Sequence, residues 1–306
     1  MIDITLENFQ TELIEGSMAA PVLLDIWAEW CGPCKQLGPV LEQLEVEYAG
    51  RFTLAKLDAD KVPQISQQLS QMFGVRSIPF CVMFKGGQPV DGFVGAVPAA
   101  EIRTFLDKHV PAPEELAAAA QEEAAQDALA EGDTEGALEK LQHAVATDPS
   151  NDDTRFDYVK LLLLQGRDDD AKVAFAPVIS KAPTVRRFDA LQRWMDAIDF
   201  ANPPTGAAPA LAELDAKIAA AKRDFPARFD RARLLMAAQR WTDAMDELLE
   251  ILMRDKSWSE DLARKTYVAI LEIIEPPKVK VADGQIPPAD PTVSTYRRRL
   301  SSVVLS

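Results

Sequence analysis

The sequence places two cysteines three positions apart in the stretch Trp27-Ala28-Glu29-Trp30-Cys31-Gly32-Pro33-Cys34-Lys35. The residues just before it, 22–26, read Val-Leu-Leu-Asp-Ile and have the length and residue types of a buried strand. Residues 35–48 repeat apolar side chains at the spacing of a helix. A strand is therefore predicted to deliver both cysteines to the N-terminus of a helix.

That position favours redox chemistry for the two thiols. Free backbone N–H groups and the positive end of the helix dipole stabilise a thiolate relative to a thiol. We therefore predict that Cys31 is the exposed nucleophile. Cys34 lies about one turn further along the same helix face and is predicted to resolve a mixed disulfide formed at Cys31. Gly32 and Pro33 between them suit the first turn of a helix.

A metal site is the alternative for a Cys-x-x-Cys pair, because half of a zinc site has the same spacing. The sequence contains no second pair of this kind, and neither His109 nor His143 lies at ligand spacing. We therefore favour redox chemistry and expect no metal and no other cofactor. The third cysteine, Cys81, falls in an apolar run and is predicted to pack in the core rather than to act as a redox partner.

Length and charge limit the classes of function. The chain has 306 residues, which is more than one typical domain, and a net charge of −15. Nucleic-acid binding is disfavoured, because phosphate contacts need clustered Lys and Arg. No apolar stretch approaches the roughly 18 residues of a membrane span, and the first residues lack the pattern of a secretion signal. We expect a cytoplasmic protein that binds neither nucleic acid nor membranes.

An internal repeat follows residue 110, where the composition shifts to Ala, Leu, Glu and Gln and predicts helices. Three residues recur with a shift of 34 positions, the tetratricopeptide period: Gly132, Ala137 and Pro149 return as Gly166, Ala171 and Pro183. The Arg-Phe-Asp sequence at 155–157 also returns at 228–230. A plain helical bundle is the alternative, but the matched spacings favour degenerate repeats, whose concave surfaces bind partner proteins.

The end of the chain combines a proline-rich linker, 275–291, with a predicted amphipathic helix, 292–306. The helix has an apolar stripe that includes Val293 and Tyr296, and three consecutive arginines at 297–299. It could bind a groove on another protein, or it could seal the end of the repeats. The pattern alone favours neither role. The predicted domains are thus 1–110 and 111–274, followed by the linker and the helix.

Residues 1–110 resemble thioredoxin in both motifs and their order. The resemblance rests on 25–35, on Ala55-Lys56-Leu57-Asp58, on Ile78-Pro79 and on Val94-Gly95-Ala96. It implies an α/β thioredoxin fold, with a central mixed sheet flanked by helices, and a cis peptide bond before Pro79. It also implies a flat groove for unfolded substrate backbone, formed by Trp30, Gly32, Pro33, Ile78, Pro79 and Gly95.

The same resemblance implies that Asp25 accepts a proton from Cys34, with Lys56 nearby. A carboxylate inside an apolar strand should have a raised pKa, which suits a general base near neutral pH. The alternative for Asp25 is a polar residue at the end of a strand. For Pro79 the alternative is an ordinary proline of an edge strand, which the apolar run that follows it disfavours.

A thioredoxin-like domain, degenerate tetratricopeptide repeats and the ending Tyr296-Arg297-Arg298-Arg299-Leu300 together resemble the bacterial chaperedoxins, the CnoX or YbbN family. The resemblance covers essentially the full length. It implies a holdase that binds unfolded or oxidation-prone clients, protects their cysteines through mixed disulfides, and passes them to the chaperonin GroEL/GroES and to DnaK. The C-terminal helix would dock on the chaperonin through Tyr296, Arg297, Arg298, Leu300 and Val304.

Two positions depart from patterns seen in that family. Some members lack the first cysteine of the motif, whereas this chain has both Cys31 and Cys34, so we expect disulfide reduction supported by a recycling thiol reductase. Ala59 stands where such members can carry a cysteine, so protection would run through Cys31. Two other functions stay open: a dedicated disulfide reductase whose repeats select substrates, and a scaffold whose cysteine pair is vestigial.

Overall fold

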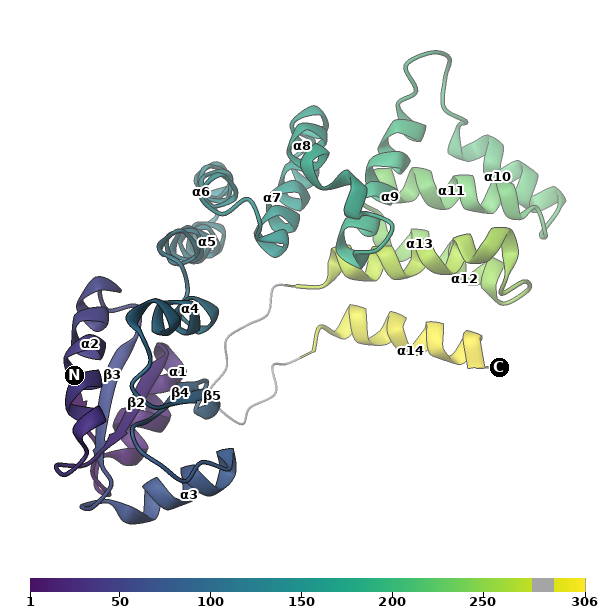
Figure 1. Cartoon of the computed structure of the whole chain (residues 1–306). Coiled ribbons are helices and arrows are strands. Elements are labelled where there is room, and N and C mark those ends of the chain that lie inside the picture. The colour runs from purple at the N-terminus through teal and green to yellow at the C-terminus, as the bar shows by residue number, and fades with distance from the viewer. Residues whose placement is uncertain (277–288, 306) are drawn as a thin grey trace. The chain divides into compact units, whose positions relative to one another are not determined.

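The computed structural model describes residues 1–276 and 289–305 and divides into two compact units, Met1–Ala117 and Ala118–Ser306. The first unit contains a sheet with helices, and the described part of the second is built from helices (Figure 1). The predicted α/β fold followed by helical repeats is therefore confirmed. Most of the predicted linker, 275–291, lies outside the described residues. None of the described helices combines the length and hydropathy that a membrane span requires.

A mixed sheet of five strands in the order β1-β3-β2-β4-β5 forms the centre of the first unit. Strands β1 (Ile2–Asp3), β2 (Val22–Trp27) and β3 (Thr53–Asp58) run parallel to one another. Strand β4 (Phe80–Lys85) is antiparallel to β2, and β5 (Gln88–Val94) is antiparallel to β4. The central strand β2 is buried along its length except at its last residue, which explains its nearly continuous apolar sequence.

Helices cover both faces of this sheet. On the face that carries Leu23, apolar residues of α2 (Gly32–Glu47) and α4 (Ala99–His109) complete one core. On the opposite face, α3 (Pro63–Phe73) and the π-helix η1 (Phe9–Glu15), which continues into α1 (Gly16–Ala19), enclose a second core. The end of β2 and the start of α2 therefore lie on a scaffold that is packed from both sides.

The helices of the second unit follow one another in pairs. In chain order they are α5 (Pro113–Glu131, which begins in the first unit), α6 (Thr134–Thr147), α7 (Asp152–Leu164), α8 (Asp168–Phe175), the 3-10 helix η2 (Ala176–Lys181), α9 (Arg186–Ala201), α10 (Leu211–Ala220), α11 (Phe225–Ala237), α12 (Trp241–Leu252), α13 (Trp258–Ile274) and α14 (Pro291–Leu305). Neighbouring helices such as α6 and α7, and α11 and α12, pack against each other. One continuous apolar core runs through the unit.

The repeat read from the sequence is also a repeat of structure. Gly132 and Gly166 end the first helix of successive pairs, and both have positive φ angles, 83° and 69°. Left-handed backbone favours glycine because a Cβ atom is strained there. Ala137 and Ala171 follow at the same distance, and both are fully buried. The 34-residue spacing therefore marks a recurring turn and a recurring close approach between helices.

The longer repeat centres on two buried arginines, Arg155 of α7 and Arg228 of α11. Each donates to the carbonyl oxygen six residues before it, from Nη2 to Pro149 (3.3 Å) and from Nε to Lys222 (3.0 Å). Each also donates a hydrogen bond from Nη1 to the residue 19 positions later. Arg155 meets only the backbone carbonyl of Ala174 there, at 3.1 Å.

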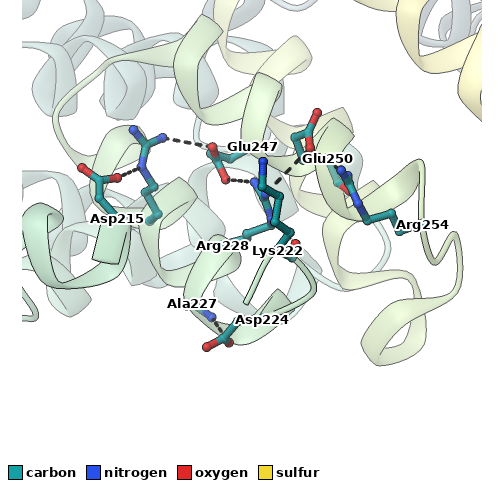
Figure 2. A network of polar contacts seen from close by, with 9 residues as sticks. Asp215, Lys222, Asp224, Ala227, Arg228, Glu247, Glu250 and Arg254 are labelled. Atoms are coloured by element: carbon teal, nitrogen blue, oxygen red, sulfur yellow. Dashed lines mark hydrogen bonds and ion pairs between the residues drawn. The ribbon is translucent and has the colours of Figure 1, made fainter. Parts of the chain in front are cut away.

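The second arginine meets a carboxylate instead (Figure 2). Nη1 of Arg228 donates to Oε2 of Glu247 at 2.8 Å, and Arg231 pairs with the other oxygen of Glu247 at 3.2 Å and with Asp215 at 2.7 Å. This network joins α10, α11 and α12. The two arginines thus occupy equivalent positions, but of the two, within the described residues, it is Arg228 that pairs with a half-buried carboxylate.

Replacing Arg228 with Met should destabilise the helical unit by about 2 kcal/mol, because the half-buried Glu247 keeps its charge and loses its closest partner, with Arg231 remaining. The same replacement at Arg155 leaves no carboxylate behind and should cost about 1 kcal/mol. Urea unfolding followed by far-ultraviolet circular dichroism measures both losses. Equal losses at the two positions would show that the ion pair adds nothing to the shared backbone contacts.

Candidate redox site

Cys31 and Cys34 form a disulfide at the start of α2. Strand β2 ends at Trp27, and Cys31 is the N-cap residue of the helix. The backbone N–H of Cys34 donates to Sγ of Cys31 at 3.2 Å. After reduction, this N–H and the helix dipole would stabilise negative charge on the Cys31 sulfur. The local geometry therefore agrees with a nucleophilic role for Cys31.

The prediction that Cys31 is exposed is wrong for this disulfide-bonded state. Cys31 and Cys34 are each only 3% exposed. The disulfide packs with Ala28, and the side chain of Ile78 lies against this small cluster. The exposure of the whole residues therefore does not distinguish the two cysteines, whereas the hydrogen bond that Sγ of Cys31 accepts does.

The predicted groove residues differ in how far they are exposed. Trp30 is 71% exposed, and its Nε1 donates to Oδ2 of Asp60 at 2.9 Å. Gly32 and Pro33 are exposed as well. The peptide bond between Ile78 and Pro79 is cis, as the resemblance implied.

Gly95 belongs to the same region, since its N–H donates to the carbonyl of Pro79 at 2.8 Å and its φ is 91°. Pro79 itself is buried, whereas Ile78 and Gly95 are half-buried. Asp60, which holds the exposed indole of Trp30, was missed at the sequence level because nothing in the motif points to it. Binding of substrate backbone along this surface stays a prediction.

Asp25 lies in the middle of β2 and is 1% exposed, so it is not a polar residue at the end of a strand. Burial raises the pKa of its carboxyl to about 6, although the charge of Lys56 and a hydrogen bond from Cys81 act in the opposite direction. Lys56 is the register partner of Asp25 on β3, and its Nζ pairs with Oε1 of Glu42 at 2.5 Å. A carboxyl with this pKa can exchange protons near neutral pH.

Cys81 is a free cysteine and is fully buried, which agrees with the predicted core position. Its contact with Asp25, in which Sγ of Cys81 lies 3.7 Å from Oδ1, was not predicted. This contact follows from the pairing of β2 with β4, because Asp25 and Cys81 are partners in that register. Across residues 1–276 and 289–305, no group of three or more His, Cys, Asp or Glu side chains is arranged to hold a metal ion.

The predicted partner residues of the C-terminal helix are partly occupied by contacts within the second unit. Tyr296 is 9% exposed, its OH donates to Asp246 at 3.1 Å, and its carbonyl accepts from the OH of Tyr267 at 2.8 Å. Leu300 packs against the same core, and Arg297 pairs with Glu275. Helix α14 therefore closes the end of the helical stack in this structure.

Arg298 and Val304 are less buried than Tyr296. Arg298 is exposed and Val304 is half-buried. Arg297 is exposed as well, although it pairs with Glu275, so another protein could reach Arg297 and Arg298 without a movement of α14. Docking of a chaperonin on this helix stays a prediction.

Comparison with known proteins identifies the first unit. The model of the thioredoxin family matches residues 1–108. Thioredoxin from Chlorobaculum thiosulfatiphilum is 47% identical over 104 residues, which are 34% of this chain and 91% of that protein. The chain belongs to the thioredoxin family.

Other thioredoxins match the same part of the chain. Thioredoxin 1 of Nostoc sp. is 40% identical over 107 residues, which are 35% of this chain and 94% of that protein. The chloroplastic M-type thioredoxin of Zea mays is 40% identical over 90 residues, which are 29% of this chain and 52% of that protein. Family membership and the Cys31–Cys34 pair support thiol–disulfide oxidoreductase activity in general.

The second unit matches two models of the tetratricopeptide repeat, over residues 128–195 and 205–304. The second match includes α14, in agreement with its packing against α12 and α13. The chain is thus a thioredoxin domain followed by tetratricopeptide repeats. The thioredoxins named above align with the first unit alone.

Proposed function

We propose that this thioredoxin-family protein is a redox-active holdase of the chaperedoxin type. Its repeats bind apolar segments of unfolded proteins, and its cysteine pair reduces or protects the cysteines of those clients. The observation that carries the proposal is an apolar cavity within the repeats, which ordinary thioredoxin chemistry does not require. This cavity has a volume of about 270 Å³.

The cavity lies among α5, α6 and α7. Its walls combine apolar side chains with a few polar ones: Ala125, Leu129, Leu141, Leu161 and Leu164, with Glu122, Gln126, Asp157 and Lys160. Leu129 is 40% exposed, so part of the apolar wall faces solvent. Burying one leucine-sized client side chain here would stabilise the complex by about 2 kcal/mol. Such contacts favour reversible holding of many sequences rather than tight binding of one.

Two charged residues give the cavity a way to bind the backbone of a client. Burial raises the pKa of Asp157, although Arg187 and Lys160 oppose this shift. Burial also lowers the pKa of Lys160, whose Nζ donates to the carbonyl of Glu275 at 3.2 Å. A carboxylate and an ammonium on an apolar wall can accept from an N–H group and donate to a carbonyl of an extended segment.

The thiol chemistry proceeds in two exchanges. The Cys31 thiolate attacks a client disulfide, forms a mixed disulfide and releases one client thiolate. The Cys34 thiolate then attacks Sγ of Cys31, releases the second client thiolate and forms the disulfide present in this structure. Asp25 takes the proton of Cys34 in this second step. A recycling thiol reductase in the cytoplasm supplies two electrons to restore the dithiol.

Delivery is the last part of the proposal and rests on the resemblance to chaperedoxins. Clients would pass to the chaperonin GroEL/GroES and to DnaK, with α14 as the docking element. Arg298 is an accessible cation on a protein with a net charge of −15. An acidic surface on the partner would complement it.

Aggregation of a urea-unfolded client, followed by light scattering after dilution, tests the holding activity. The variant with both Cys31→Ala and Cys34→Ala should still suppress aggregation, because the cavity contains no thiol. Leu129→Glu should raise the concentration needed for half suppression by roughly tenfold, since a charge replaces an apolar wall.

Val173→Glu is the matched control. Val173 is 75% exposed on α8 and is not part of the cavity wall, so this variant should behave like the unchanged protein. If the thiol-free variant lost suppression altogether, the protein would be a disulfide reductase whose repeats only select substrates. If Leu129→Glu and Val173→Glu acted alike, the cavity would not be the holding site.

A further inference from the structure

The thiol of Cys81 takes no part in the exchange steps above, yet it contacts the proposed proton acceptor. Its Sγ lies 3.7 Å from Oδ1 of Asp25, and the two residues are 0% and 1% exposed. They are paired in the antiparallel register of β2 and β4. Strand pairing therefore holds the thiol next to the carboxyl group.

The direction of this hydrogen bond follows from the chemistry of the two groups. An ionised carboxylate can only accept, so the thiol must donate. Burial, followed by the nearby charge of Asp25, raises the pKa of Cys81 well above its usual range. The thiol therefore keeps its proton under conditions in which Asp25 is ionised. A thiol is a weak donor, but a bond of this kind is strengthened in an interior from which water is excluded.

Two other charged groups act on Asp25 in opposite directions, and Lys56 has the larger effect, ahead of the hydrogen bond from Cys81. The positive charge of Lys56 on β3 stabilises the carboxylate and lowers the pKa of Asp25, whereas the negative charge of Glu42 on α2 raises it. These two side chains also pair with each other, at 2.5 Å. Within the described part of the chain, the hydrogen bond from Cys81 is the side-chain bond that the Asp25 carboxyl accepts. Cys34 on α2 is the remaining titratable group of the site.

We propose that Cys81 is a positioning residue for thiol–disulfide exchange, whose S–H group holds Asp25 in its ionised form, ready to take the proton of Cys34. The inference rests on the proposed role of Asp25. In the resolving step the proton moves from the Cys34 sulfur to a carboxylate oxygen of Asp25. The Cys34 sulfur then bonds to Sγ of Cys31, and the client thiolate leaves. Cys81 binds Oδ1, leaves Oδ2 for the incoming proton, and is neither oxidised nor reduced.

The test compares three variants at position 81 in the full-length protein. Cys81→Ala and Cys81→Val remove the donor, and the larger valine fills most of the space that alanine leaves empty. Cys81→Ser keeps a donor. The measurement is the single-turnover rate at which the pre-reduced protein reduces insulin between pH 5 and pH 9. A ¹³C NMR titration of the Asp25 carboxyl group is the second readout.

Loss of the donor should shift the acid limb of the rate profile and the carboxyl titration to higher pH, because the ionised form loses its hydrogen bond. The rate at pH 6 should fall by roughly threefold to tenfold, and the rate at pH 9 should stay unchanged. Cys81→Ser should restore both midpoints. An unmoved carboxyl titration in Cys81→Val, or a Ser variant that behaves like the Val variant, would overturn the inference.

Asp25→Asn separates this inference from the proposed function. If Asp25→Asn removes the acid limb while Cys81→Val leaves it in place, only the role of Cys81 fails. If Asp25→Asn leaves the limb unchanged, Asp25 is not the proton acceptor and the kinetic part of both proposals fails. The carboxyl titration still reports in that case whether Cys81 favours the ionised form of Asp25.

Discussion

Replacing Cys34 with serine should reduce multiple-turnover insulin reduction by roughly 10³-fold or more and leave the client attached to Cys31. Serine preserves the shape of the side chain but cannot attack a disulfide. An external thiol must then resolve the mixed disulfide, and it lacks the advantage of a group held in place by the first turn of α2. Mass spectrometry of the non-reduced protein should show a stable adduct with the client.

Cys31→Ser is the companion variant. It removes the sulfur that accepts the N–H hydrogen bond of Cys34, and it should lose both the turnover and the adduct. An adduct that forms equally well in Cys31→Ser would mean that Cys34 is the attacking thiol. Turnover that survives in Cys34→Ser would exclude the resolving role assigned to it.

Local pattern was enough to predict the strand and the helix around the cysteine pair. Residues 22–26 are apolar because β2 is covered on both faces, and the cysteines follow at the first helical turn. The 34-residue repeat could also be predicted from the sequence, because the glycine of each turn needs a positive φ where the chain folds back. Both features depend on neighbours in the sequence.

The contacts that the sequence did not predict depend on pairing between distant segments. Asp25 and Cys81 face each other because of the register in which β2 pairs with β4. A shift of that register by one residue would separate them. The apolar stripe of α14 shows which face is buried, but not what covers it. In the structure α12 and α13 cover it, and Asp246 binds both Tyr296 and Arg299. The exposure of Cys31 likewise depended on how Ile78 packs.

Asp25→Asn should slow the resolving step by roughly 10²-fold or more near pH 7, because the amide cannot take a proton from Cys34. The same change should stabilise the thioredoxin unit above pH 6. Burial raises the pKa of Asp25 to about 6 from 3.8, so the folded state binds this proton more tightly than the unfolded state does. The ionised carboxylate therefore costs stability as pH rises from about 4, and the full cost is present above about pH 6.

The gain in unfolding free energy from Asp25→Asn should consequently be small at pH 4 and about 2 to 3 kcal/mol larger at pH 8. Urea unfolding of the oxidised proteins at both pH values measures this difference. The signal is the fluorescence of Trp27 and Trp30, in proteins whose other three tryptophans are changed to Phe. A gain that does not depend on pH would mean that the carboxyl group ionises normally in the folded protein. Slow resolution and higher stability appearing together would instead show that the buried charge is retained for proton transfer, at the expense of the fold.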